Sequence, residues 1–399
     1  MADVTKPELL PSIPGHIRLS PEFRLLAACS WVAPPSTAKY QAEEIDSLCN
    51  ECMDWDAFTN LVDRHEAAAL VYASLQKHAE SRFPGEIKGK LKKRSEQVRR
   101  QALLHSAELV RLVRSFAGHG IDVLPLKGVT LSLQLYGDPG MRLSRDMDLM
   151  VRQENLDRAD SLLEAEGYRR TFPEAGMTAR QHRYLLSNCH HYGYQRERLG
   201  LHLELHWRCD VWTEELSEEL WGRCRPIDWM GVRIKYPAED ALLLFLCDHG
   251  ARHKWLRLKW LSDAAMLLSR QRPAECDNLI AVARRLDLAL ILAQTALLAN
   301  WLYEIRLPEP LRNLIFQEKS VYKLAIEALG ALLGSDQYRL LGGLRDMRYN
   351  MCLKSTMSHY TALKYLLISP SDFEEFRLPD NLFWLYCPLR PFLWLKRHI

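Results

Sequence analysis

Two carboxylates two residues apart lie inside an apolar stretch, Arg142-Leu-Ser-Arg-Asp146-Met-Asp148-Leu-Met-Val151. In a β-strand successive side chains point to opposite faces, so Asp146 and Asp148 would share one face while Met147 and Leu149 pack on the other. Two neighbouring anions repel each other unless a positive charge lies between them. Mg²⁺, which prefers oxygen ligands and often accompanies a phosphorylated substrate, suits that position. A salt-bridged Asp-x-Asp on a loop is the alternative.

A third carboxylate lies on a later strand. The segment from Leu201 to Trp207 alternates regularly, so that His202, Glu204 and His206 share its polar face. If this strand neighbours the aspartate strand, Glu204 comes beside the aspartates, and three carboxylates can hold two Mg²⁺ about 3.5–4 Å apart. Mn²⁺ is the alternative ion. The His-x-Glu-x-His face is itself a candidate metal site, but the aspartates favour Mg²⁺. We predict that His206 either orients one of the metal-binding carboxylates or binds the second substrate, the acceptor of a transferred group. The role of His202 is left open.

Lys127 and Gly128 follow a short apolar strand candidate, residues 121–126, and precede a helical segment. A glycine at this position lets backbone N–H groups approach a phosphate at the start of a helix. We predict that Lys127 and Gly128 bind the phosphates of a nucleotide, together with the arginines upstream of the aspartates, Arg142 and Arg145. In this scheme one metal ion holds the triphosphate and the other activates a hydroxyl of the acceptor.

The elements around these residues predict an α+β fold with three regions. Residues 1–118 form an N-terminal helical region, residues 119–236 a catalytic core with a small mixed β-sheet, and residues 237–399 a C-terminal helical region. Arg198-Leu-Gly200 is typical of a hairpin turn before the last strand of the core. One helix is expected to run from His249 to Asp263, with His249, His253, Arg257 and Trp260 on one face.

Composition excludes some classes of protein. The formal net charge of +3 over 399 residues is too small for a dedicated nucleic-acid binder. Ten cysteines without a regular framework, and an N-terminus unlike a signal peptide, predict a cytoplasmic protein. No apolar stretch approaches the ~18 residues of a transmembrane helix. The aromatic segment 382–395 is expected to pack against the body of the protein, and weak peripheral contact with a membrane is the minority interpretation.

The chain resembles a known family in Leu126-Lys-Gly128, Tyr136, Pro139, Arg142 and the stretch from Asp146 to Val151. These residues look like the core of the uncharacterised nucleotidyltransferase family, which belongs to the polymerase-β-like nucleotidyltransferase superfamily. The resemblance extends from the N-terminal helices to at least residue 268. It implies that Asp146 and Asp148 are the metal pair, that Gly128 is the glycine of the phosphate loop, and that Glu204 is the third carboxylate.

The same resemblance implies roles for further residues. Val129 stands where the family usually has a small hydroxyl residue, so Thr130 is expected to supply that group. The helix from His249 to Asp263 would close over the nucleotide, with His253, Arg257 or Lys259 neutralising phosphate charge. Asp263 would orient one of these cations.

The resulting hypothesis is a Mg²⁺-dependent enzyme that moves a nucleoside monophosphate from an NTP, such as ATP, to a hydroxyl of an unknown acceptor. The acceptor is a peptide, a saccharide, a small molecule or an RNA. RNA is the less favoured choice, because the basic run Lys88–Arg100 is more typical of a solvated helix face. The alternatives are a non-catalytic nucleotide sensor or scaffold, and transfer of a sugar from a nucleotide-sugar.

Overall fold

The computed structural model describes residues 10–51, 53–173, 176–209, 214–334, 342–353 and 367–398. The chain divides into two compact units, each assembled from segments that are separate in the sequence. The first, called the helical unit here, comprises Met1–Arg100, Leu135–Leu143 and Leu243–Leu353. The second, the sheet unit, comprises Gln101–Gln134, Ser144–Leu242 and Lys354–Ile399.

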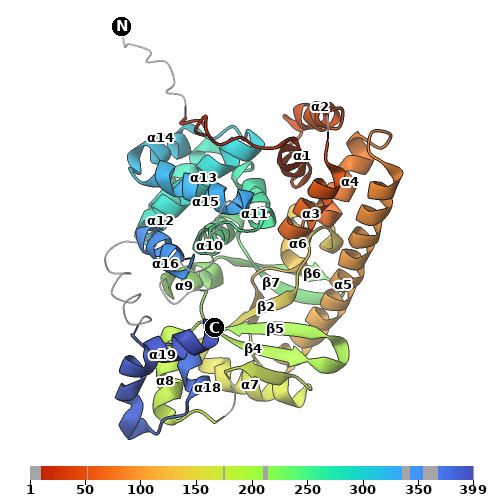
Figure 1. The fold of residues 1–399 in the computed structure, drawn as a ribbon. Coiled ribbons are helices and arrows are strands. Elements are labelled where there is room, and N and C mark those ends of the chain that lie inside the picture. Colours follow the sequence, from red (N-terminus) through yellow and green to blue (C-terminus); the bar gives the residue numbers. More distant parts are fainter. Residues whose placement is uncertain are drawn as a thin grey trace. The chain divides into compact units, whose positions relative to one another are not determined.

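The sheet unit contains a five-stranded sheet in the order β1-β2-β5-β4-β3. Figure 1 labels its strands β2, β5 and β4. Its strands are β1 (Val123–Pro125), β2 (Asp146–Val151), β3 (Arg169–Phe172), β4 (His191–Arg196) and β5 (Leu201–His206). Strands β2 and β5 run parallel and the other neighbours run antiparallel, so the sheet is mixed. Strands β6 (Cys224–Trp229) and β7 (Val232–Pro237) form a separate two-stranded sheet. The predicted α+β fold class with a small mixed sheet is confirmed.

Helices cover one face of the larger sheet. The helical elements of the sheet unit are the part of α5 (Gly85–Gly118) after Arg100, most of α6 (Val129–Tyr136), η2 (Gln153–Asn155), α7 (Leu156–Ala165), α8 (Ala179–Asn188), η3 (Glu197–Leu199) and α9 (Glu214–Gly222). The short η1 (Pro139–Met141) belongs to the helical unit. Phe116 of α5 and Leu163 of α7 are fully buried in one core with Leu149 of β2 and Leu205 of β5. Because these apolar side chains occupy one face, the alternating polar side chains of β2 and β5 are left for the other face.

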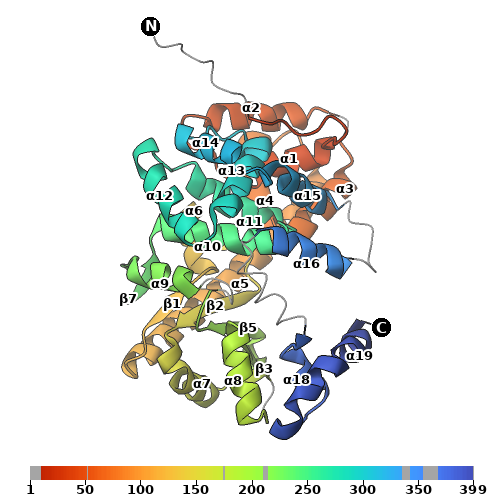
Figure 2. The ribbon, with the colours of Figure 1, turned by 90° about the vertical axis from the view of Figure 1, so that its left-hand side faces the viewer.

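The C-terminal segment folds onto α8. It forms α18 (Ser371–Glu375), η4 (Asp380–Leu385) and α19 (Tyr386–His398), as Figure 2 shows. Phe373, Phe383 and Tyr386 form an apolar cluster against Tyr184 of α8. The prediction that residues 382–395 pack against the body is confirmed for Phe383 and Tyr386, whereas Trp384 and Phe392 are exposed. Peripheral membrane contact stays a prediction.

The helical unit joins helices from both ends of the sequence. Its helices are α1 (Pro21–Cys29), α2 (Ala38–Leu48), α3 (Trp55–His65), α4 (Ala68–His78), α10 (Glu239–Arg252), α11 (Leu258–Leu268), α12 (Pro273–Arg285), α13 (Ala289–Tyr303), α14 (Glu309–Gln317), α15 (Val321–Leu333) and α16 (Gly342–Leu353). Helix α13 is apolar around most of its surface and packs against α1, α11, α14 and α15, which explains its position at the centre of this unit. Within the described residues, no helix combines the length and the apolar character needed to cross a membrane.

The prediction of one continuous helix from His249 to Asp263 is wrong. Helix α10 ends at Arg252, and Lys254 and Trp255 take left-handed backbone conformations with φ of 49° and 55°. The chain turns here because the fully buried indole of Trp255 packs against Gly250, where any side chain would overlap the ring. Helix α11 then starts at Leu258, whose N–H donates to Nδ1 of the buried His65 at 3.1 Å.

Candidate functional site

The parallel pairing of β2 with β5 brings the predicted carboxylates together. Asp148 lies directly opposite Glu204, and Asp146 lies opposite His202. Asp148 is buried, with 3% of its surface exposed, whereas Asp146 and Glu204 are partly exposed. Because side chains alternate along a strand, Asp146 and Asp148 lie on the same face of β2.

Two cationic groups flank the buried Asp148. Lys127 Nζ lies 3.1 Å from Asp148 Oδ1, and His206 Nε2 lies 3.4 Å from the same oxygen. Burial alone would raise the pKa of Asp148, but Lys127 and His206 together hold it well below its usual range. The carboxylate is therefore ionised, and its charge is compensated within the sheet unit.

His206 bridges the two carboxylates. Its Nε2 atom lies 3.3 Å from Glu204 Oε2, in addition to its contact with Asp148. Burial alone would lower the pKa of His206, but the two carboxylates outweigh this effect and raise it. The alternation of residues 201–207 predicts that His206 shares the face of Glu204, and in the structure His206 contacts both Asp148 and Glu204.

The residues present fit a divalent cation. Asp148, Glu204 and His206 each offer a ligand atom, and these atoms lie within 4.8 Å of one another. Carboxylate oxygens are the ligands that Mg²⁺ prefers. The buried Oδ1 of Asp148 makes no hydrogen bond within the described residues, so it has room for a further ligand contact. Asp146 is not one of these three, although it lies two residues before Asp148 on the same strand.

Gly128, the glycine of the predicted phosphate loop, lies at the turn between β1 and α6. Gly128 adopts φ of +77°, a left-handed conformation that strains other residues, and it immediately precedes α6. Thr130 is fully buried and its hydroxyl donates to the carbonyl oxygen of Lys127 at 2.9 Å. That hydroxyl therefore stabilises the start of α6, and its predicted role toward a nucleotide stays a prediction.

Two predicted nucleotide-binding arginines have different surroundings. Arg142 lies in the helical unit, where its Nε donates to Asp263 Oδ2 at 2.7 Å and both side chains are almost completely buried. Tyr136 also donates its hydroxyl to Asp263, at 3.3 Å. Arg145, just before β2, is exposed. The cation that donates a hydrogen bond to Asp263 is thus Arg142. The sequence analysis had expected Asp263 to orient His253, Arg257 or Lys259 instead.

His253, Arg257 and Lys259 all have contacts inside the helical unit. The Lys259 ammonium pairs with Glu66, and burial lowers its pKa to about 8. The Arg257 guanidinium donates to the backbone carbonyl of Arg64. The His253 ring packs against Trp260, with ring centroids 5.3 Å apart. The roles of the three residues toward phosphate stay predictions.

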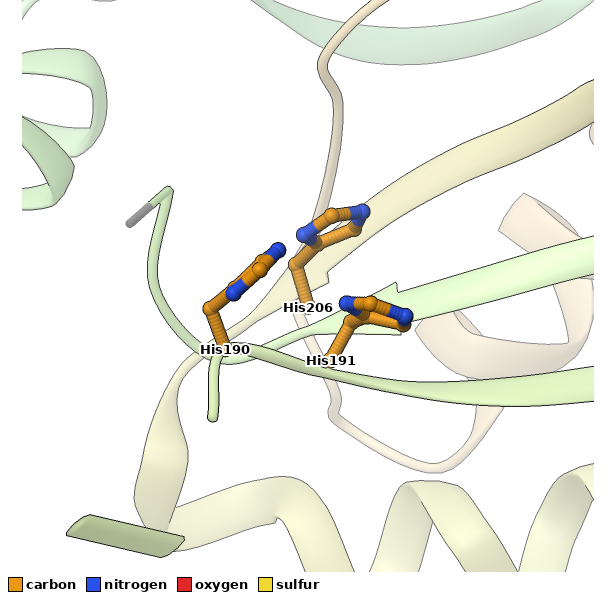
Figure 3. A group of neighbouring side chains, drawn as sticks. All are labelled: His190, His191 and His206. Atoms are coloured by element: carbon orange, nitrogen blue, oxygen red, sulfur yellow. The ribbon is translucent and has the colours of Figure 1, made fainter. Parts of the chain in front are cut away.

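Two histidines that the sequence analysis did not single out lie beside His206. The rings of His190, His191 and His206 gather at one end of the β4–β5 hairpin (Figure 3). Their centroids are 4.6 Å apart for His190 and His191, 5.6 Å for His190 and His206, and 5.3 Å for His191 and His206. Burial, reinforced by His206, lowers the pKa of His191 to about 4, so this imidazole is neutral.

Comparison with known families now identifies the class of protein. A model of the uncharacterised nucleotidyltransferase family matches residues 51–304, which is more than half of the 399 residues. The chain belongs to this family, and the matched region contains Gly128, both aspartates and Glu204. Membership supports nucleotidyl transfer with an NTP as donor, and nucleotidyltransferases generally use divalent metals. The comparison with curated proteins gave no match.

The contact between Lys127 and Asp148 leads to a prediction about stability. Replacing Lys127 with Met should lower the free energy of unfolding by about 2 kcal/mol in the presence of a chelator, because Asp148 loses a charged partner. Adding Mg²⁺ should recover most of this loss, since a bound cation would take over the compensation. Urea unfolding with and without Mg²⁺ measures both effects.

Lys235→Met is the matched control for this variant. Lys235 pairs with Asp122 at 2.6 Å, but its side chain is 42% exposed, so its loss should cost less than about 1 kcal/mol. Mg²⁺ should make no difference to the Lys235 variant. Equal losses for Lys127→Met with and without Mg²⁺ would contradict a cation site at Asp148.

Proposed function

We propose that the sheet unit catalyses the Mg²⁺-dependent transfer of a nucleoside monophosphate from an NTP to a hydroxyl group of an acceptor. The observation that carries this proposal is the register of β2 against β5, which sets Asp148 opposite Glu204 with His206 between them. Family membership supports the reaction class, and the acidic pair supports the metal dependence.

Asp146, Asp148 and Glu204 are the residues that would hold the metal. Bound there, Mg²⁺ would add positive charge beside the phosphates and lower the pKa of the attacking hydroxyl. The chain itself would hold the phosphates through backbone N–H groups near Gly128 at the start of α6, where the helix dipole also favours an anion. Lys127 would add a point charge next to that loop.

The proposed reaction is a displacement at the α-phosphorus. A bond forms between the acceptor oxygen and this phosphorus, the bond to the β-phosphate bridging oxygen breaks, and pyrophosphate leaves. Glu204 is our candidate for receiving the proton of the acceptor hydroxyl, because its side chain is 34% exposed while Asp148 is buried. His206 would position Glu204 through its Nε2 contact.

The test is a set of reactions of the purified chain with each NTP, Mg²⁺ and a cell extract. We expect one component of the extract to gain the mass of a nucleoside monophosphate, with an equal amount of pyrophosphate released. Nucleotide binding measured by calorimetry without pyrophosphate release would favour a sensor instead. Release of a nucleoside diphosphate from a nucleotide-sugar would favour sugar transfer.

A further inference from the structure

The histidines at the end of the β4–β5 hairpin form a second group of candidate metal ligands. His190, His191 and His206 each offer one ring nitrogen, and the three nitrogens lie within 4.8 Å of one another. The backbone fixes this arrangement, because His191 is the cross-strand neighbour of His206 and the carbonyl of His190 accepts the N–H of Trp207 at 3.1 Å. Figure 3 shows the three rings on the same side of the hairpin.

The two nitrogens of each ring have different surroundings. Nε2 of His206 lies within 3.4 Å of both Asp148 and Glu204, and Nε2 of His191 lies 3.9 Å from Glu204. Nδ1 of His191 and both ring nitrogens of His206 are buried and make no hydrogen bond within the described residues, although Nε2 of His206 lies close to the two carboxylates. His206 itself is only 4% exposed, so water cannot readily satisfy its Nδ1.

This is the pattern of metal-binding histidines. A histidine that binds a metal through one nitrogen usually donates the N–H of its other nitrogen to a carboxylate, which orients the ring and makes it a better ligand. The carboxylates of Asp148 and Glu204 lie within 3.4 Å of Nε2 of His206, where such an acceptor is needed, and this leaves its Nδ1 as the nitrogen for a metal ion. A cation there would satisfy nitrogens that are costly to bury alone.

We propose that His190, His191 and His206 form a binding site for a transition-metal ion of the Zn²⁺ type, adjacent to the carboxylate pair. Imidazole nitrogens suit Zn²⁺, whereas Mg²⁺ selects oxygen ligands, so the two groups of side chains differ in the ion they prefer. Zn–N bonds of about 2.0–2.1 Å place tetrahedral ligands about 3.4 Å apart. The ring nitrogens, now within 4.8 Å of one another, would have to come closer together to reach that value, and three protein ligands leave the fourth position to water.

The experiment titrates the metal-stripped full-length chain with Co²⁺, which replaces Zn²⁺ and reports tetrahedral coordination by its visible absorption. The wild type should bind one equivalent that excess Mg²⁺ does not displace and that Zn²⁺ does. His190→Gln and His191→Gln should each weaken binding by at least about 100-fold. His202→Gln, which changes an exposed histidine on the same hairpin, should bind like the wild type. This readout does not depend on nucleotidyl transfer.

X-ray absorption of the Zn²⁺-loaded wild type provides a second measurement that needs no variant. We expect a first shell dominated by imidazole nitrogens. The proposal is overturned if the wild type binds no Co²⁺, if both histidine variants bind it as the wild type does, or if the first shell consists of oxygen atoms. Binding that Asp148→Asn abolishes and the histidine variants retain would place the ion on the carboxylates and also overturn it.

Discussion

Replacing Asp148 with Asn should lower nucleotidyl transfer by about 10³-fold or more, while the chain keeps its fold. Asp148 is the most deeply buried of the three carboxylates and lies opposite Glu204, so its charge is the one best placed to hold a cation between the strands. Asn has the same shape but no negative charge. Lys127, which loses its ionic partner in this variant, retains some exposure to water, so the cost to stability should be small.

The measurement compares initial rates of pyrophosphate release at saturating NTP and Mg²⁺, with unfolding curves for both proteins. Asp157→Asn is the matched control, because Asp157 is an exposed aspartate of α7 in the same unit. It should leave the rate unchanged. Full activity of Asp148→Asn would remove Asp148 from the catalytic machinery and with it the proposed mechanism.

The strand faces that carry Asp146, Asp148 and Glu204 could be predicted, because they depend only on the alternation of apolar and polar residues within each segment. The alternation of residues 201–207 places Glu204 and His206 on one polar face, and the apolar flanks of Asp146 and Asp148 indicate a strand. The pairing of β2 with β5 could only be assumed, because no local signal states which strands become neighbours. The structure supplies that pairing and its register.

The histidine cluster was missed although the sequence held a signal for it. The hairpin turn was recognised at Arg198-Leu-Gly200, and the structure pairs Arg196 with Leu201 across it. Counting back along both strands from that pair sets His191 opposite His206, because pairing in an antiparallel hairpin keeps the sum of the two residue numbers constant. The register of a hairpin therefore shows which residues of its two strands become neighbours, whereas the alternation along one strand shows only which face each residue occupies.

The break between α10 and α11 could not be predicted from helical spacing. Residues 249–263 keep apolar and polar positions in helical register, and only Gly250 interrupts them. The turn depends on burial of the Trp255 ring against that glycine and on His65, which is nearly 200 residues earlier in the chain and accepts the N–H of Leu258. Tertiary contacts of this kind override local propensity.

Replacing Arg142 with Met should lower the free energy of unfolding by about 3–5 kcal/mol, because it leaves the carboxylate of Asp263 buried without its closest cation. This follows from the position of Arg142 inside the helical unit, where 4% of its side chain is exposed. Urea unfolding measures the loss. Arg24→Met is the matched control, since Arg24 pairs with Glu51 at 3.5 Å on the surface and should cost less than about 1 kcal/mol.

The pH dependence of this loss has a definite sign. Burial raises the pKa of Asp263 above its ordinary value, and Arg142 opposes that rise, so the pKa should rise further in Arg142→Met. The folded variant then holds a proton that the unfolded chain releases above the ordinary carboxyl pKa, so its stability falls as pH increases through that window. The difference from the wild type should be smaller at about pH 5 than at about pH 8.

A second substitution separates a structural role of Arg142 from a role in nucleotide binding. Adding Asp263→Asn to Arg142→Met removes the unpaired buried charge and should restore part of the stability. Should Arg142→Met also weaken nucleotide binding, a double variant that regains both stability and affinity would show that Arg142 acts by holding the helical unit together. If stability returns while affinity does not, Arg142 also contacts the nucleotide, as the family resemblance implied. An Arg142→Met protein as stable as the wild type would contradict the ion pair as a source of stability.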